Sequence, residues 1–91
     1  MFRVKSQWGD FAGRVDQVWI VEEPGIKLAT EQGLIGPDYI YKLKGGYSGR
    51  EVLLASFDDY NAVKRIINAI IDTAKKEVLV DIAVLIEADD A

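Results

Sequence analysis

The sequence contains no cysteine and no histidine, and each absence excludes a class of chemistry. Without cysteine, the chain forms no disulfide, carries no thiolate nucleophile and offers no thiolate ligand to a metal. Without histidine, it lacks the commonest general base, the commonest nitrogen ligand for metals and the only side chain that titrates near neutrality when unperturbed. We therefore predict a protein that is not an enzyme and that holds no cofactor.

Carboxylates are the remaining route to chemistry, and none of their clusters has the spacing of a calcium-binding loop. The clusters are Glu22 with Glu23, Asp58 with Asp59, and the group of Glu87, Asp89 and Asp90. For each cluster the favoured interpretation is helix capping or a solvated surface, and a metal-dependent hydrolase is kept as a third hypothesis. Asp81 stands alone in an apolar segment, where an ion pair or exposure at a sheet edge is expected.

The chain also lacks a basic surplus and a long apolar run. Its net charge is −4, whereas duplex-binding domains normally carry excess positive charge. This balance argues against nucleic acid as a general partner, but it is compatible with a local basic face. No apolar run approaches the ~20 residues that cross a membrane, so no membrane partner is expected. A single domain over 1–91 is expected from the length, and the absence of a signal-peptide pattern predicts a cytoplasmic protein.

Alternating apolar and polar residues, separated by turn residues, predict five strands in the first two thirds of the chain. They are expected at residues 2–8, 15–21, 26–31, 39–44 and 50–57. The glycines within 45–49 predict a hairpin loop between the last two of these strands, because glycine adopts positive φ without steric cost.

The periodicity then changes to that of an amphipathic helix, which is expected at 59–76. Its apolar residues are Val63, Ile66, Ile67, Ile70 and Ala74. Asp58 is the expected N-cap, because its carboxylate can accept hydrogen bonds from the free amides of the first turn.

The segment 78–86 is apolar except for Asp81, and its β-branched side chains favour a strand over a second helix. In such a strand, one face carries Val78, Val80, Ile82, Val84 and Ile86. A strand that is apolar on both faces must either curl against its own sheet, as in a half-barrel, or meet another chain. We therefore treat these five residues as a candidate self-association surface and expect a homo-oligomer, with a dimer as the first guess.

These elements follow the order β-β-β-β-β-α-β. Hairpins between successive strands predict an α+β fold with a mostly antiparallel sheet of about five to six strands. One long amphipathic helix near the C-terminus would cover one face of this sheet. A curled half-barrel and an assembled sheet remain as alternatives.

Basic residues recur at strand spacing and form a second candidate surface. They are Arg3, Lys5, Lys42, Lys44 and Arg50. Beside aromatic side chains, such a surface can bind single-stranded nucleic acid, which is the alternative function. Tyr39 and Tyr41, however, share a face with Leu43 opposite the lysines, so a core face backed by a solvated face is favoured. Trp8 and Trp19 are expected in the core or in a dimer contact.

Two segments are similar to parts of known proteins. The stretch from Val4 to Gly9, which reads Val-Lys-Ser-Gln-Trp-Gly, resembles the opening strand of small uncharacterised proteins from Gram-positive bacteria and their phages. The stretch from Val52 to Phe57, with the helix that follows it, resembles their later segment. The resemblance implies an α+β domain of mobile-element origin and assigns no catalytic residue. With the apolar last segment, it leads to the hypothesis of a non-enzymatic protein–protein interaction or assembly module of a bacterium or phage.

Overall fold

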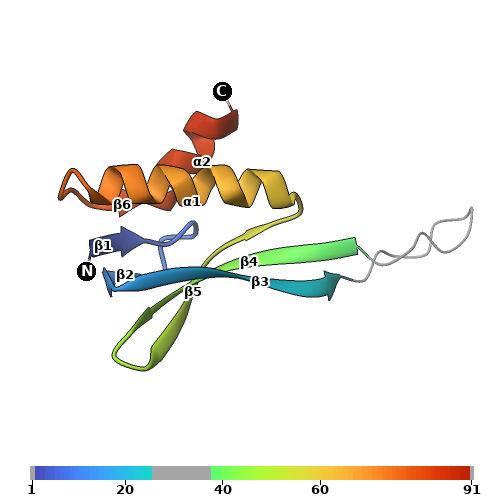
Figure 1. Cartoon of the computed structure of the whole chain (residues 1–91), viewed down its shortest axis with the longest axis horizontal. Coiled ribbons are helices and arrows are strands. Elements are labelled where there is room, and N and C mark those ends of the chain that lie inside the picture. The colour runs from blue at the N-terminus through green and yellow to red at the C-terminus, as the bar shows by residue number, and fades with distance from the viewer. Residues whose placement is uncertain (1, 26–37, 91) are drawn as a thin grey trace, which may run out of the picture.

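The structure, a computed structural model, describes residues 2–25 and 38–90, which form six strands and two helices (Figure 1). The strands are β1 (Phe2–Lys5), β2 (Ala12–Val15), β3 (Gln17–Gly25), β4 (Asp38–Tyr47), β5 (Arg50–Phe57) and β6 (Val80–Asp81). The helices are α1 (Tyr60–Ala74) and α2 (Ile82–Asp90). The α+β class and the mostly antiparallel pairing are confirmed, whereas the strand expected at 26–31 lies outside the described residues.

The strands form two three-stranded sheets rather than one. Sheet A has the order β2-β1-β6, in which β2 is antiparallel and β6 parallel to β1, and sheet B is the antiparallel meander β3-β4-β5. The strand expected at 15–21 breaks at Asp16, because β2 pairs with β1 while β3 pairs with β4. At this break, the Asp16 amide donates to the Gly46 carbonyl at 2.9 Å. The prediction of a single sheet, with a half-barrel as one form, is therefore wrong.

The turn between β1 and β2 is organised around a buried serine. The strand expected at 2–8 ends at Lys5, and the following Ser6 is fully buried. Its hydroxyl donates to Asp10 Oδ1 at 2.6 Å and accepts from the Phe11 amide at 3.2 Å. The two hydrogen bonds offset the cost of removing the hydroxyl from water, so Ser6 can stabilise a turn where the alternation predicted more strand.

The β4–β5 hairpin is tighter than the glycine-rich sequence predicts. Tyr47 is paired with Arg50, so only Ser48 and Gly49 form the turn, and both have positive φ, 55° and 81°. Two central residues with positive φ are typical of the type I′ turn, whose twist matches that of the flanking strands. The bounds of β5 agree with the prediction, whereas β4 extends to Tyr47, three residues beyond the predicted end at Lys44.

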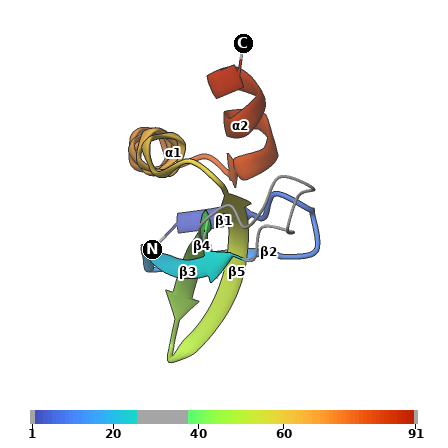
Figure 2. The ribbon, with the colours of Figure 1, turned by 90° about the vertical axis from the view of Figure 1, so that its right-hand side faces the viewer.

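Helix α1 is confirmed, and its N-cap is one residue later than expected. The Asn61 amide donates to Asp59 Oδ1 at 3.0 Å, so Asp59 rather than Asp58 caps the helix. Val63, Ile66 and Ile70 are its buried residues. Figures 1 and 2 show α1 and α2 on the same side of the two sheets.

The segment after α1 differs most from its prediction. Only Val80 and Asp81 form a strand, and α2 begins at Ile82. Asp81 Oδ1 accepts from the Val84 amide at 3.4 Å, so the lone acid caps the N-terminus of α2. The strand expected over 78–86 is therefore wrong, because a capping residue in the middle of the segment allows a helix to start there.

Helix α2 is held by the core and by an ion pair. Ile82 is fully buried, and Leu85 and Ile86, three and four residues further on, pack against the core. Arg65 Nε and Nη2 donate to the two carboxylate oxygens of Asp89 at 2.8 and 3.1 Å, which joins α2 to α1. These contacts stabilise a helix in a segment whose alternating apolar residues would also fit a strand.

One core lies between the two sheets and the helices. Its buried apolar residues are Val4, Val15, Leu43, Leu54, Ala55, Val63, Ile66, Ile70, Val80 and Ile82. Neither helix in the described part of the chain is long and apolar enough to span a membrane.

Candidate binding surfaces

The five residues of the candidate self-association surface do not share one face. Val80 and Ile82 are fully buried, whereas Val78 and Val84 are 53% and 56% exposed. Ile86 is half-buried against the core. These residues point in different directions because 80–81 form the short strand β6, whereas 82–86 belong to helix α2. The prediction that these five residues form one apolar strand face is therefore wrong. Self-association through the exposed Val78 and Val84 stays a prediction.

The basic residues of the second candidate surface are divided between the two sheets. Arg3 and Lys5 are exposed on β1, on either side of the fully buried Val4. Because successive side chains of a strand point to opposite faces, both cations lie on the outer face of sheet A. Arg50 lies at the start of β5, paired in register with Tyr47.

The lysines of the set lie on the outer face of sheet B, on the side of β4 away from the buried Leu43. Lys42 Nζ is 2.7 Å from Glu23 Oε2, and this hydrogen bond lowers the pKa of the Glu23 carboxyl. Lys44 is paired in register with Trp19, which is half-buried. The favoured interpretation, a core face backed by a solvated lysine face, agrees with this arrangement.

Arg14 adds a third cation to Arg3 and Lys5. It was not predicted as part of the basic surface, because it falls between the strands expected at 2–8 and 15–21. It is exposed on β2, and the register of the antiparallel pair places it directly opposite Arg3. Its alternation with Gly13 and Val15 is the signal that could have revealed it. We define Arg3, Lys5 and Arg14 as the basic face. None of the three forms an ion pair with another residue that the structure describes.

An exposed tryptophan lies next to the basic face in the β1–β2 turn. Trp8 is 52% exposed, so the alternative that places it in the core is wrong. A Cβ built on the adjacent Gly9 would lie 3.6 Å from Lys5 Cε, which shows that the Lys5 side chain lies along this turn. The exposed indole and the Lys5 side chain therefore lie at the turn end of sheet A.

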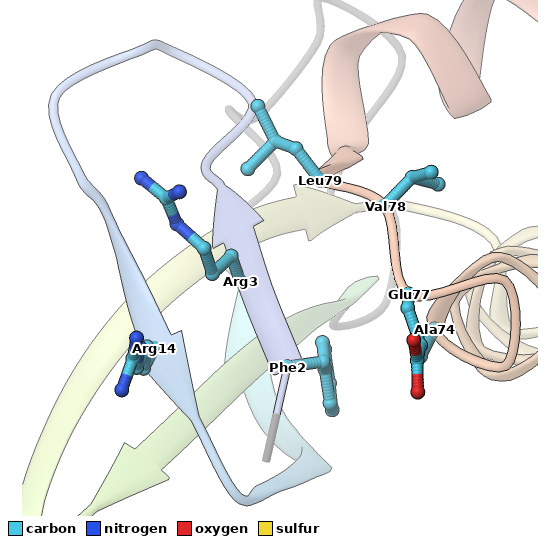
Figure 3. Close-up of a pocket in the computed structure, with 7 residues that line it drawn as sticks. All are labelled: Phe2, Arg3, Arg14, Ala74, Glu77, Val78 and Leu79. Atoms are coloured by element: carbon cyan, nitrogen blue, oxygen red, sulfur yellow. The ribbon is translucent and has the colours of Figure 1, made fainter.

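A pocket of about 400 Å³ opens at the other end of the basic face (Figure 3). It is lined by Phe2, Arg3, Arg14, Ala74, Glu77, Val78 and Leu79. Figure 3 shows Arg3 on β1 between Arg14 on β2 and Leu79 in the segment that precedes β6. Glu77 has a φ of 57° at the point where the chain turns back from α1. The pocket combines guanidinium groups with apolar side chains and one carboxylate.

One carboxylate of each acidic cluster, and the lone Asp81, is engaged in local structure. Asp59 caps α1 and Asp81 caps α2. Asp89 accepts from Arg65, and this hydrogen bond lowers the pKa of the Asp89 carboxyl. Within residues 2–25 and 38–90, no three acidic side chains gather closely enough to hold a metal ion.

No protein-family model matches the chain, and neither a curated protein nor a solved structure matches it. The resemblance to proteins of Gram-positive bacteria and their phages therefore stays a prediction.

Proposed function

We propose that the protein is a non-enzymatic binding module that holds the phosphates of single-stranded nucleic acid on its basic face. The observation that carries this proposal is the register pairing of Arg3 with Arg14. Like charges directly opposite each other on a sheet are destabilising. An anion between the two guanidinium groups removes that repulsion and gains charge-assisted hydrogen bonds from both.

The size and surroundings of the basic face favour a single strand over a duplex. Duplex-binding domains carry a basic surplus over much of their surface, and this chain has a net charge of −4. Single-strand binders combine a small basic surface with aromatic rings on which bases stack. Trp8, 52% exposed in the turn along which the Lys5 side chain lies, supplies such a ring.

The absence of an enzymatic role is part of the proposal. Neither a thiol nor an imidazole exists in the sequence. The carboxylates that cap the helices and pair with arginine already have structural partners.

The test measures the fluorescence anisotropy of a labelled oligonucleotide of about 12 residues as salt is raised. Each phosphate contact with a single strand contributes about −0.7 to the slope of log affinity against log salt concentration. If Arg3, Lys5 and Arg14 each contact one phosphate, the slope should be about −2. The double variant Arg3→Gln/Arg14→Gln should bind at least about tenfold more weakly at low salt, with a slope of about −0.7.

The matched control is Lys42→Gln/Lys44→Gln, which removes the same charge from the other sheet. It should keep the affinity and the slope of the wild type. Equal losses in both double variants would mean that net charge, not the basic face, governs binding. Absence of binding at low salt would refute the proposal, and equal binding of polyglutamate would identify an acidic protein as the better partner.

A second candidate function, self-association, is supported by three exposed apolar side chains within seven residues of chain. Val78, Leu79 and Val84 are 53%, 48% and 56% exposed. Light scattering at several concentrations tests it, with Val84→Lys as the disruptive variant. Ile71→Lys, at a 46% exposed position on α1, is the matched control. A wild-type protein that stays monomeric at every concentration would eliminate this function.

A further inference from the structure

Besides the pocket of Figure 3, a groove lies between β2 and the β4–β5 hairpin, next to the basic face. It has a volume of about 410 Å³, within the ~300–1,000 Å³ of small-ligand sites. It is lined by Phe11, Gly13, Arg14, Val15, Tyr47, Arg50, Glu51 and Val52. Arg14 also lines the pocket of Figure 3, so the groove continues the basic face around the edge of β2.

The fold builds the groove from residues that are distant in sequence. A Cβ on Gly13 would lie 2.9 Å from Phe11 Cζ, so the phenyl ring lies directly over β2 at Gly13. Across the groove, Tyr47 and Arg50 are directly paired in the hairpin and therefore share one of its faces. The tight two-residue turn fixes both side chains on that face.

The lining combines two aromatic rings with two guanidinium groups. Phe11 is half-buried and Tyr47 is 43% exposed, so one ring is fixed by packing and the other is accessible to a ligand. Aromatic faces suit a planar ring, and Arg14 and Arg50 suit an anion attached to it. Glu51 at the rim adds an acceptor for the N–H groups of a base.

We propose that this groove holds one nucleobase of the bound strand, stacked against Tyr47, with its phosphate on Arg14 and Arg50. This inference rests on the proposed function and deepens it, because it specifies a base site beside the phosphate-binding basic face. A ligand with only phosphates would leave the aromatic lining unused, and one with only an apolar ring would leave both guanidinium groups unpaired.

The experiment compares a normal oligonucleotide with an abasic one of the same length and charge. Wild-type protein should bind the normal strand at least about fivefold more tightly, the lower bound for one stacked base. Tyr47→Ala should lose this preference while its salt slope remains that of the wild type. Tyr47→Phe retains the ring and should retain the preference. The exposure of Tyr47 means that the fold tolerates both variants.

A nucleoside 5′-monophosphate provides a second readout in nuclear magnetic resonance titrations. It should shift the ring resonances of Phe11 and Tyr47, whereas inorganic phosphate should leave them unchanged. Equal affinity for normal and abasic strands, with no ring shifts, would overturn the base site and leave the basic face intact. Failure of the wild type to bind either strand would refute the proposed function and this inference together.

Discussion

Sheets A and B both carry cations at alternate positions of an outward face, but the residues opposite those cations differ. In sheet A, Arg3 is paired with Arg14, and no carboxylate of the described residues forms an ion pair with either. In sheet B, Lys42 is paired in register with Val21 and forms an ion pair with Glu23. The same spacing therefore places two cations opposite each other in sheet A, whereas in sheet B one of the two lysines is paired with a carboxylate. The charges carried by the neighbouring strand, not the spacing, decide between them.

The largest expected effect comes from the place where the two sheets meet. A Cβ on Gly45 would lie 2.9 Å from Leu54 Cδ1 and 3.0 Å from Val15 Cγ1, and both of these side chains are buried. We expect Gly45→Ala to lower the free energy of unfolding by about 1–3 kcal/mol, because the core cannot yield without strain. Urea denaturation measures this change.

Gly46→Ala is the matched control for Gly45→Ala. Its Cβ would meet the Trp19 ring at 3.0 Å on the outer face of sheet B, and this half-buried ring is less confined than the fully buried Leu54 side chain. A smaller loss of stability than at Gly45 is expected, because a half-buried ring yields more easily than a fully buried side chain. Equal losses at the two positions would mean that the sheet junction is no more tightly packed than the outer face.

The next effect concerns the short third strand of sheet A and the helix that follows it. Asp81→Ala removes the cap of α2 and should lower the free energy of unfolding by about 1 kcal/mol, because the Val84 amide loses its acceptor. Asp81→Asn keeps an acceptor oxygen and should restore most of the stability. Glu87→Ala, an exposed change in the same helix, should be neutral. If Asp81→Asn is as harmful as Asp81→Ala, the charge rather than the cap matters.

Removal of one cation should change the free energy of unfolding in opposite directions in the two sheets. This effect is smaller, but it distinguishes sheet A from sheet B most directly. Arg14→Gln should raise the free energy of unfolding by about 0.2–1 kcal/mol, because it removes a like-charge pair. Lys42→Gln should lower it slightly through the loss of the ion pair with Glu23. Both changes should shrink in high salt. Destabilisation by Arg14→Gln would indicate a structural role for this guanidinium and weaken the proposed function.

The smallest expected difference is acid sensitivity, which belongs to sheet B. The hydrogen bond from Lys42 makes the pKa of Glu23 lower in the folded protein than in the unfolded chain. The pair therefore stabilises the fold at neutral pH, and this contribution is lost as pH falls through the folded pKa. Glu23→Gln should be slightly less stable than the wild type at neutral pH, with a gap that closes below about pH 4. A gap that persists in acid would mean that charge pairing is not its cause.

Prediction from sequence succeeded where the signals were local. Helix α1, Tyr60–Ala74, lies within the expected 59–76, because its apolar spacing and capping carboxylate act over a few residues. Strand β5, Arg50–Phe57, has the expected bounds. In the candidate binding surface, the alternation around Val4 correctly placed Arg3 and Lys5 on an outer face.

Prediction failed where two local readings competed. Residues 82–86 satisfy both the period of a strand and the spacing of a helix, and contacts of Ile82 with the core and of Asp89 with Arg65 favour the helix. Arg14 was missed because the glycines around it indicated a turn, whereas β2 forms by pairing with β1.

The sequence by itself determined that the protein lacks thiol and imidazole chemistry, that an amphipathic helix follows a set of strands, and that Arg3 and Lys5 share one face. Only the tertiary structure decided that two sheets form, that Arg14 stands opposite Arg3, and that a groove lies between β2 and the β4–β5 hairpin. The physical reason is range. Capping and side-chain periodicity depend on neighbours in sequence, whereas strand register and charge pairing depend on segments that meet only when the chain folds.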